Sequence, residues 1–151
     1  RKGQSVVATL TQHHVVISSD TVVALQGKMY GKPQDRAEVR KVLLELSGKT
    51  HQVYTAVVVF IGGHEFTHVE AVDVTFKDIS PRLMENYVAS GDSLDKAGSY
   101  GIQGQALTFI AGLKGDYAAV MGFPLAAFCA MMEGPVRNRQ GWTSPWQDYF
   151  S

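Results

Sequence analysis

Two long runs of β-branched and aromatic residues, separated by a glycine pair, constrain the fold of this chain more than any other feature. The first run extends from Thr50 to Ile61, and Gly62-Gly63 supplies a turn after it. The chain then returns from His64 to Phe76 with alternating polar and apolar residues. The pattern predicts a long β-hairpin over residues 50–76.

Three segments around this hairpin have the periodicity or the capping residues of helices. In the first, apolar residues recur at the spacing of one helical face. The second has a capping serine followed by a proline in the first turn, and the third starts with a proline. The predicted helices run from about Asp35 to Leu46, from Ser80-Pro81 to a stop at Gly91, and from Leu125 to Met132.

Shorter apolar runs predict additional strands at Val15–Ile17, Val22–Leu25 and Ala106–Leu113. The polar residues Ser18 to Thr21 separate the first two runs, so we expect them to interrupt what would otherwise be one buried strand. Helices and strands together predict an α/β fold with a mixed, twisted β-sheet, flanking helices and a long hairpin.

Length and composition limit the class of protein. A chain of 151 residues fits one domain with a sizeable core. Its 14 basic and 14 acidic residues give a formal net charge of zero, which argues against a partner such as a nucleic-acid polymer. A single cysteine, Cys129, excludes an intrachain disulfide, and no apolar run is long enough to span a bilayer. With no secretory signal visible, we expect a cytoplasmic protein without membrane association.

A glycine-rich stretch from Asp95 to Gly104 fits neither a helix nor a strand. Gly98, Gly101 and Gly104 are spaced by three and allow the backbone to bend or to approach a ligand closely. Either a ligand site or a tight structural turn would account for such a loop. The spacing does not match the dinucleotide-binding fingerprint, which needs glycines at the first, third and sixth places.

Ser47-Gly48-Lys49-Thr50 resembles the end of a phosphate-binding P-loop, but the required first glycine is replaced by Leu43. The stretch also follows a predicted helix instead of a strand. We therefore reject a P-loop at this position.

Two charged residues are candidates for a site. Asp20 follows an apolar run, where a carboxylate could hold a divalent cation or activate a water, because strand ends in open α/β sheets line ligand crevices. A turn or cap aspartate is the alternative. Lys32 precedes Pro33, which favours an extended backbone that could direct the ammonium at a phosphate. The alternative is a solvated loop lysine.

Histidine and cysteine positions do not predict a metal site made of protein ligands alone. His64 and His68 would share one face of a strand but stand roughly 13 Å apart, too far to share an ion. His51 and Cys129 have no obvious partners, so a cysteine–histidine nucleophile is not supported.

Five separated motifs, taken together, resemble the Maf family of nucleoside triphosphate pyrophosphatases. Their order and spacing match from about Val15 to Met132. They are Ser19-Asp20-Thr21, Gly31-Lys32-Pro33, the stretch Ser47-Gly48-Lys49-Thr50-His51-Gln52-Val53-Tyr54-Thr55, the loop Asp95 to Gly104, and Gly115-Asp116-Tyr117 with Gly122-Phe123-Pro124.

The resemblance implies a Maf/ITPase-like fold and hydrolysis of a nucleoside triphosphate between its α and β phosphates. It also implies a divalent metal, magnesium or manganese. Asp20 matches the family's catalytic aspartate, which is the general base or holds the metal with the substrate phosphates and water. Lys32 matches a phosphate-contacting lysine, and Lys96 with Asp95 matches residues that line or brace the pocket.

Thr21 and Gln103 match the residues that set which base the family accepts. Threonine and glutamine at these two positions resemble the residues of the family branch that acts on dTTP and UTP. The alternatives are another base preference, such as 7-methyl-GTP, or a non-catalytic nucleotide-binding or interaction module of the same fold. The resemblance also makes a homodimer possible.

Two departures from the family pattern affect the expected organisation. Family members begin with a Ser-x-Ser-x-Arg-Arg phosphate loop that these 151 residues do not include, and Ala119 replaces the usual asparagine before Val120. We therefore expect a single Maf-like domain over residues 1–151 that is incomplete at its N-terminus, with an aromatic C-terminal tail over residues 134–151.

Overall fold

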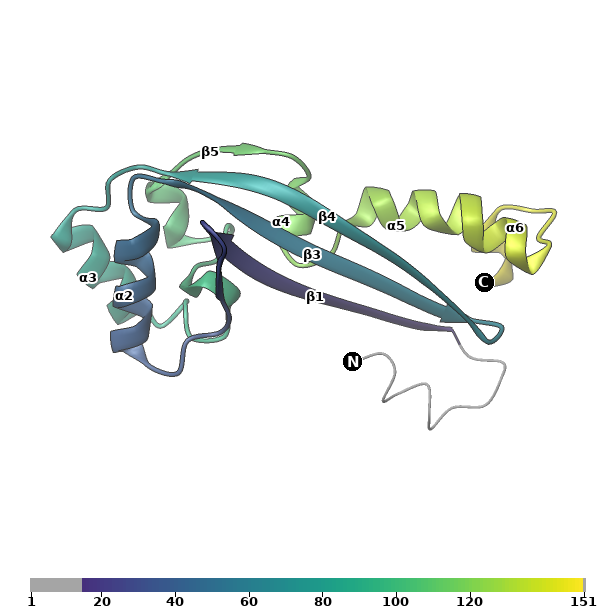
Figure 1. The fold of residues 1–151 in the computed structure, drawn as a ribbon, viewed down its shortest axis with the longest axis horizontal. Helices are drawn as coiled ribbons and strands as arrows, with labels where there is room; N and C mark the ends of the chain where they lie inside the picture. The colour runs from purple at the N-terminus through teal and green to yellow at the C-terminus, as the bar shows by residue number, and fades with distance from the viewer. Residues whose placement is uncertain (1–14, 151) are drawn as a thin grey trace.

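The long hairpin is the central element of the computed structural model, which describes residues 15–150. Strand β3 (Thr50–Ile61) pairs with β4 (His64–Phe76) from Thr50 opposite Thr75 to Ile61 opposite His64. Gly62 and Gly63 form the turn between them with φ angles of 56° and 77°, which favour glycine. The predicted hairpin is confirmed, and it runs the length of the molecule (Figure 1).

Three shorter strands extend this hairpin into a five-stranded sheet with the order β2-β1-β3-β4-β5. They are β1 (Val16–Leu25), β2 (Lys28–Tyr30) and β5 (Ile110–Lys114). The α/β class with flanking helices and a long hairpin is confirmed. All pairings between these strands are antiparallel, whereas a mixed sheet was expected. Tight turns join β1 to β2 and β3 to β4, and such turns require antiparallel neighbours.

Strand β1 corrects one prediction. Ser18 to Thr21 do not interrupt the strand, because β1 pairs continuously with β3 from Val16 opposite Phe60 to Ala24 opposite Gln52. Strand β2 covers only Val23 to Leu25 of β1. Within residues 15–150, the polar part of β1 therefore lies at an open edge of the sheet, where a ligand can approach it.

Helices α2 (Arg36–Leu46) and α3 (Pro81–Ser90) confirm two predicted helices and their caps. The side chains of Asp35 and Ser80 accept hydrogen bonds from backbone N–H groups at the start of α2 and α3. Both helices lie at one end of the sheet (Figure 1) and pack on one hydrophobic core. Its fully buried members include Val39, Leu43, Leu46, Val53, Val72, Val74, Tyr87 and Phe109.

The segment before β5 differs from the predicted strand. Gln105–Thr108 forms a 3₁₀ helix, η2, and the strand begins only at Ile110. Ala106 and Phe109 are both buried in the same core, which a strand could not achieve because residues three apart point to opposite faces. The 3₁₀ turn brings both side chains inward, with the Phe109 N–H donating to the Ala106 carbonyl at 3.0 Å.

The last helical region is longer than predicted. The short helix α4 (Tyr117–Val120) precedes α5 (Leu125–Met131), which continues through a π-helical turn, η3 (Met132–Val136), into α6 (Arg137–Gln140). The wider π turn accommodates Pro135, which would otherwise clash with the preceding turn and end the helix. A second core of Val57, Val59, Ile61, Phe128, Met131, Met132 and Val136 holds this region on the hairpin.

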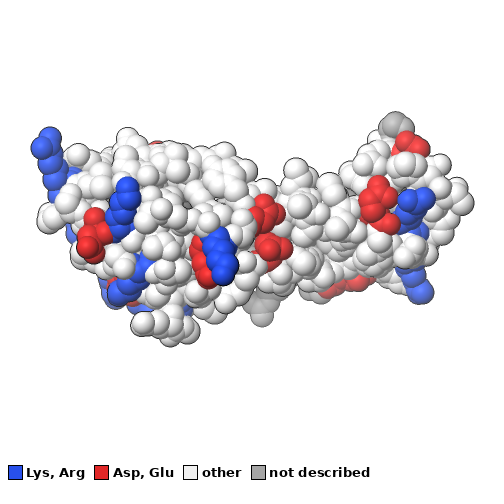
Figure 2. Space-filling view, turned by 90° about the horizontal axis from the view of Figure 1, so that it is seen from above, with Lys and Arg blue, Asp and Glu red and all other residues white. Residues whose placement is uncertain are grey.

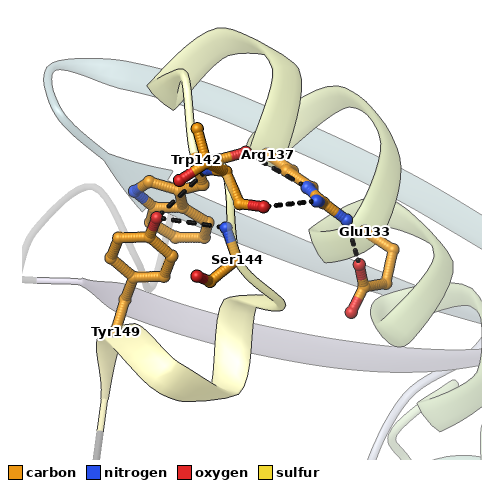
Figure 3. A network of polar contacts seen from close by, with 6 residues as sticks. Glu133, Arg137, Trp142, Ser144 and Tyr149 are labelled. Carbon is orange, nitrogen blue, oxygen red and sulfur yellow. Dashed lines mark hydrogen bonds and ion pairs between the residues drawn. The ribbon is translucent and has the colours of Figure 1, made fainter.

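The aromatic tail packs on the body of the protein. Trp142 and Trp146 contact the second core, and the rings of Trp142 and Tyr149 stack with centroids 4.7 Å apart. Arg137 donates to the carbonyl oxygens of Trp142 and Thr143, which closes the chain back on α6 (Figure 3). The short helix η4 (Trp146–Tyr149) follows, and the Tyr149 hydroxyl accepts hydrogen bonds from two backbone N–H groups.

Charged side chains lie in small groups of mixed sign on the face shown in Figure 2, with uncharged surface between them. None of the helices within residues 15–150 combines the length and the hydropathy needed to cross a membrane.

Candidate functional site

A polar cleft of about 310 Å³ lies at the open edge of β1. Four segments that are distant in sequence form it: the middle of β1, the loop after β2, the glycine-rich loop between α3 and β5, and the end of α4. The lining residues are Ser19, Asp20, Thr21, Lys32, Asp95, Lys96, Ala97, Tyr100, Gly101, Ile102, Gln103, Val120, Met121 and Gly122. All the residues predicted for a site, Asp20, Thr21, Lys32, Lys96 and Gln103, are among them.

Hydrogen bonds to distant segments explain why polar residues sit in the middle of β1. The Thr55 hydroxyl donates to the Ala119 carbonyl at 2.7 Å, which uses its only proton. Thr21 must therefore be the donor in the 3.0 Å contact between the Thr21 and Thr55 hydroxyls. The Ser19 hydroxyl lies 2.7 Å from the Gly122 carbonyl oxygen. These contacts attach β1 to the end of α4 and fix one wall of the cleft.

Asp20 lies between these two residues and points to the other face of the sheet, because side chains alternate along a strand. Its cross-strand partner is Ala56, and its side chain is exposed. The prediction that Asp20 ends a strand was wrong, because it occupies the middle of β1. Its position at an open edge still gives the carboxylate access to the cleft.

Ala119, which departs from the family pattern, is fully buried. Its carbonyl oxygen accepts the hydrogen bond from Thr55, so its contribution to the site comes from the backbone.

Two lysines bring positive charge to the cleft. Lys32 follows β2, and the Lys96 ammonium donates to the Asp95 carboxylate at 2.6 Å. This hydrogen bond and charge, with a smaller effect of Lys32, lower the pKa of the Asp95 carboxyl below its usual value. Gly101 makes room for Lys96, since a Cβ atom at Gly101 would lie 2.8 Å from the lysine Cδ and Cε.

The glycine-rich loop is held against the sheet by its backbone. Gly98 has a φ of 70°, and its N–H donates to the Gly31 carbonyl at 3.1 Å. A Cβ atom there would lie 2.5 Å from Val23 Cγ2, so the loop can approach β1 only because the residue is glycine. The Gly101 N–H donates to the Tyr87 hydroxyl at 3.2 Å. The loop thus presents the exposed side chain of Gln103 to the cleft.

The other candidate residues lie outside the cleft. The Ser47 hydroxyl accepts a hydrogen bond from the Ile79 N–H, a structural role consistent with rejection of a P-loop. His68 contacts Glu70 at 3.0 Å, and His64 accepts a hydrogen bond from Arg139. No group of three or more His, Cys, Asp or Glu side chains within residues 15–150 is arranged to hold a metal ion.

Sequence reasoning missed one buried polar contact behind the cleft. His51 is fully buried, and its Nε2 lies 2.8 Å from the Tyr100 hydroxyl, although no partner for this histidine was apparent from the sequence. The two residues are 49 positions apart, and no local pattern connects them. Both nevertheless fall within the motifs that carry the family resemblance.

A model of the family described as Maf-like protein matches residues 1–134. The chain therefore belongs to the Maf family. Two relatives that bear the name dTTP/UTP pyrophosphatase are similar to most of the chain. The protein of Bacillus anthracis (strain CDC 684 / NRRL 3495) is 42% identical over 122 residues, or 81% of this chain and 64% of that protein. The protein of Shouchella clausii (strain KSM-K16) is 42% identical over 133 residues, or 88% and 69%. The chain thus spans about two thirds of the length of these relatives.

Proposed function

We propose that the protein hydrolyses nucleoside triphosphates of the dTTP and UTP type to the monophosphate and pyrophosphate. The observation that carries the proposal is the presence of the Asp20 carboxylate, two lysines, a threonine and a glutamine in a single cleft of a Maf-family chain. They come from three separate segments, and a triphosphate with its base needs this combination of polar groups.

The reaction needs a water to attack the α-phosphorus. The bond between this phosphorus and the oxygen that bridges to the β-phosphate then breaks, and pyrophosphate leaves. Asp20 is suited to accept the proton of that water, because its carboxylate lies at an open strand edge. Lys32 and Lys96 are suited to offset the charge of the phosphates, including the charge that develops on the leaving pyrophosphate.

A divalent cation fits the donor set of this cleft. Magnesium is commonly held by one or two carboxylates together with substrate phosphates and water, so a full protein cage is not required. Asp20 would contribute a carboxylate, because it lies on the polar part of β1 that lines the cleft. When bound, the cation would neutralise phosphate charge and favour departure of pyrophosphate.

Thr21 and Gln103 are proposed to select the base. An amide offers both a donor and an acceptor, which complement the O4 and N3–H of thymine or uracil. The names of the relatives support this choice of base. A preference for 7-methyl-GTP is the alternative.

A pyrophosphate-release assay with dTTP, UTP, CTP and 7-methyl-GTP tests the proposal. We expect equimolar pyrophosphate and monophosphate from dTTP and UTP with magnesium present. Chelation with EDTA should reduce the rate by about 100-fold or more, because charge neutralisation is lost. Restoring the rate with excess magnesium is the control. Nucleotide binding without turnover would instead identify a non-catalytic module, and preferential turnover of 7-methyl-GTP would contradict the proposed base.

Gln103→Glu is expected to change the base preference. The carboxylate keeps an acceptor but loses the N–H donor, so it should repel O4 of uracil and accept from the amino group of cytosine. We expect the ratio of kcat/KM for CTP to that for UTP to rise by about 10-fold or more. Gln105→Glu, at an exposed position outside the cleft, is the matched control. An unaltered substrate profile in Gln103→Glu would exclude this role.

A further inference from the structure

A buried hydrogen bond connects the glycine-rich loop to the hairpin from behind the cleft. His51 belongs to β3 and is 0% exposed, whereas Tyr100 belongs to the loop and is 5% exposed. The His51 Nε2 and the Tyr100 hydroxyl lie 2.8 Å apart. Tyr100 also lines the cleft, so this residue touches both the buried pair and the candidate site.

The surroundings of this pair are apolar. The ring of Phe76 packs edge-on against both members, with centroids 4.7 Å from His51 and 4.8 Å from Tyr100. Burial lowers the pKa of His51 to about 4, so the imidazole is neutral at physiological pH. A hydrogen bond in such an environment is strengthened by the low dielectric, and loss of either partner leaves a buried polar atom unsatisfied.

The hydrogen bond between His51 and Tyr100 does not depend on which tautomer of His51 is present. The Nδ1 of His51 is buried and has no hydrogen-bond partner within residues 15–150. With the proton on Nδ1, the Tyr100 hydroxyl donates to Nε2, and with the proton on Nε2, the imidazole donates to the hydroxyl. The contact between His51 and Tyr100 is therefore made in either tautomer.

Tyr100 lies close in the chain to Gln103, the residue proposed to select the base. Tyr100 is only three positions from Gln103, and between them the Gly101 N–H donates to the buried Tyr87 hydroxyl. On the other side, Gly98 is fixed by its hydrogen bond to Gly31. The Tyr100 side chain is therefore the anchor between two backbone attachments of the loop.

We propose that His51 is a positioning residue that acts through Tyr100 to hold residues 95–104 in the conformation that presents Gln103 to a nucleotide. This role rests on the proposed function, because it assigns the loop to substrate binding. His51 is not itself among the residues that line the cleft.

Hydrogen exchange combined with steady-state kinetics tests this role. Tyr100→Phe and His51→Leu each remove one partner. We expect the amides of Gly98, Ser99 and Gly101 to exchange about 10-fold faster or more, whereas the amides within the β3–β4 ladder change little. The KM for dTTP should rise by about 10-fold, with kcat changed less than about 3-fold, because the loop must be ordered at the moment of binding.

Three further variants separate positioning from general stability. His51→Gln can place an amide group, which offers both a donor and an acceptor, near the position of Nε2 and should restore most of the loop protection and KM. Tyr149→Phe removes a tyrosine hydroxyl that accepts two hydrogen bonds at the far end of the molecule and should leave the loop unchanged. Val59→Ala creates a cavity in the second core and provides a variant of reduced melting temperature.

The outcomes distinguish the two proposals. Unchanged loop exchange in Tyr100→Phe and His51→Leu overturns the positioning role, whatever the activity. The positioning role is also overturned if Val59→Ala raises the loop exchange rates and the KM as much as Tyr100→Phe and His51→Leu do. General destabilisation would then be sufficient to explain both effects. A wild-type protein that releases no pyrophosphate from any of the four nucleotides overturns the proposed function, while the exchange rates still decide whether His51 holds the loop.

Discussion

Asp20→Asn is expected to reduce pyrophosphate release by about 100-fold or more while the protein keeps its fold. Asparagine has nearly the same size as aspartate but can neither accept the proton of a water nor supply a negative ligand to a cation. The side chain is exposed at the open edge of β1, so the substitution removes no core contact. Initial rates with dTTP and magnesium, together with a thermal melt, measure both effects.

Asp73→Asn is the matched control for this prediction. Asp73 lies on β4 on the same face of the sheet, outside the cleft, where its carboxylate accepts a hydrogen bond from Gln52 at 3.1 Å. Asparagine retains the acceptor oxygen, so turnover and melting temperature should stay close to those of the wild type. Unchanged turnover in Asp20→Asn would remove Asp20 from the catalytic role. A loss of equal size in both variants would attribute the effect to the sheet instead of the site.

Much of the fold could be predicted from the sequence because its determinants are local. Asp35 and Ser80 cap the helices that follow them through their own side chains. Gly62-Gly63 adopts the positive φ angles that a tight turn requires. In each case the chemistry acts within a few residues, so the order of the residues is sufficient to locate the start of a helix or the turn of a hairpin.

The continuous strand β1 could not be predicted because its polar residues are stabilised by distant segments. The partner hydroxyl of Thr21 is 34 positions away, and the carbonyl that contacts Ser19 is 103 positions away. Hydrophobic periodicity alone predicts that a strand is interrupted at such polar residues. The extension of the last helix through Pro135 was missed for a related reason, because the second core holds both sides of the π turn.

The candidate residues were found by family resemblance, and their convergence is a property of the fold. Asp20 was expected at a strand end and instead lies in the middle of an edge strand. Both positions expose a carboxylate beside a sheet, which explains why a residue with a wrongly predicted local structure still lines the candidate cleft. His51 was overlooked, because a buried histidine is recognised only once its partner is placed beside it.

The sequence leaves the glycine-rich loop open between a tight turn and a ligand site, and the geometry of Gly98 is compatible with both. The residue has a left-handed backbone that lets the loop lie against Val23, which is 2% exposed. The same close approach brings Lys96 and Gln103 to the edge of β1, where Asp20 lies. A substitution at Gly98 should therefore affect stability and substrate binding together.

Gly98→Ala is expected to destabilise the protein by about 2–4 kcal/mol. Alanine is disfavoured at a φ of 70°, and its Cβ would lie 2.5 Å from Val23 Cγ2 in a packed core. For a domain of this size the melting temperature should fall by roughly 5–15 °C. The KM for dTTP should rise as well, because the loop must move away from β1 to relieve the contact. Thermal melts and initial rates measure the two effects.

Gly104→Ala is the matched control, because its φ of 168° is extended and a Cβ there would meet Asp92 Oδ2 at an ordinary 3.6 Å. Its melting temperature should stay within about 2 °C of the wild type. Val23→Ala removes the methyl groups that Gly98→Ala would strike, so the double variant should lose less stability than the sum of the two single losses. Strict additivity would show that the backbone angle alone limits this position. A Gly98→Ala protein as stable as Gly104→Ala would contradict the close packing of the loop on β1.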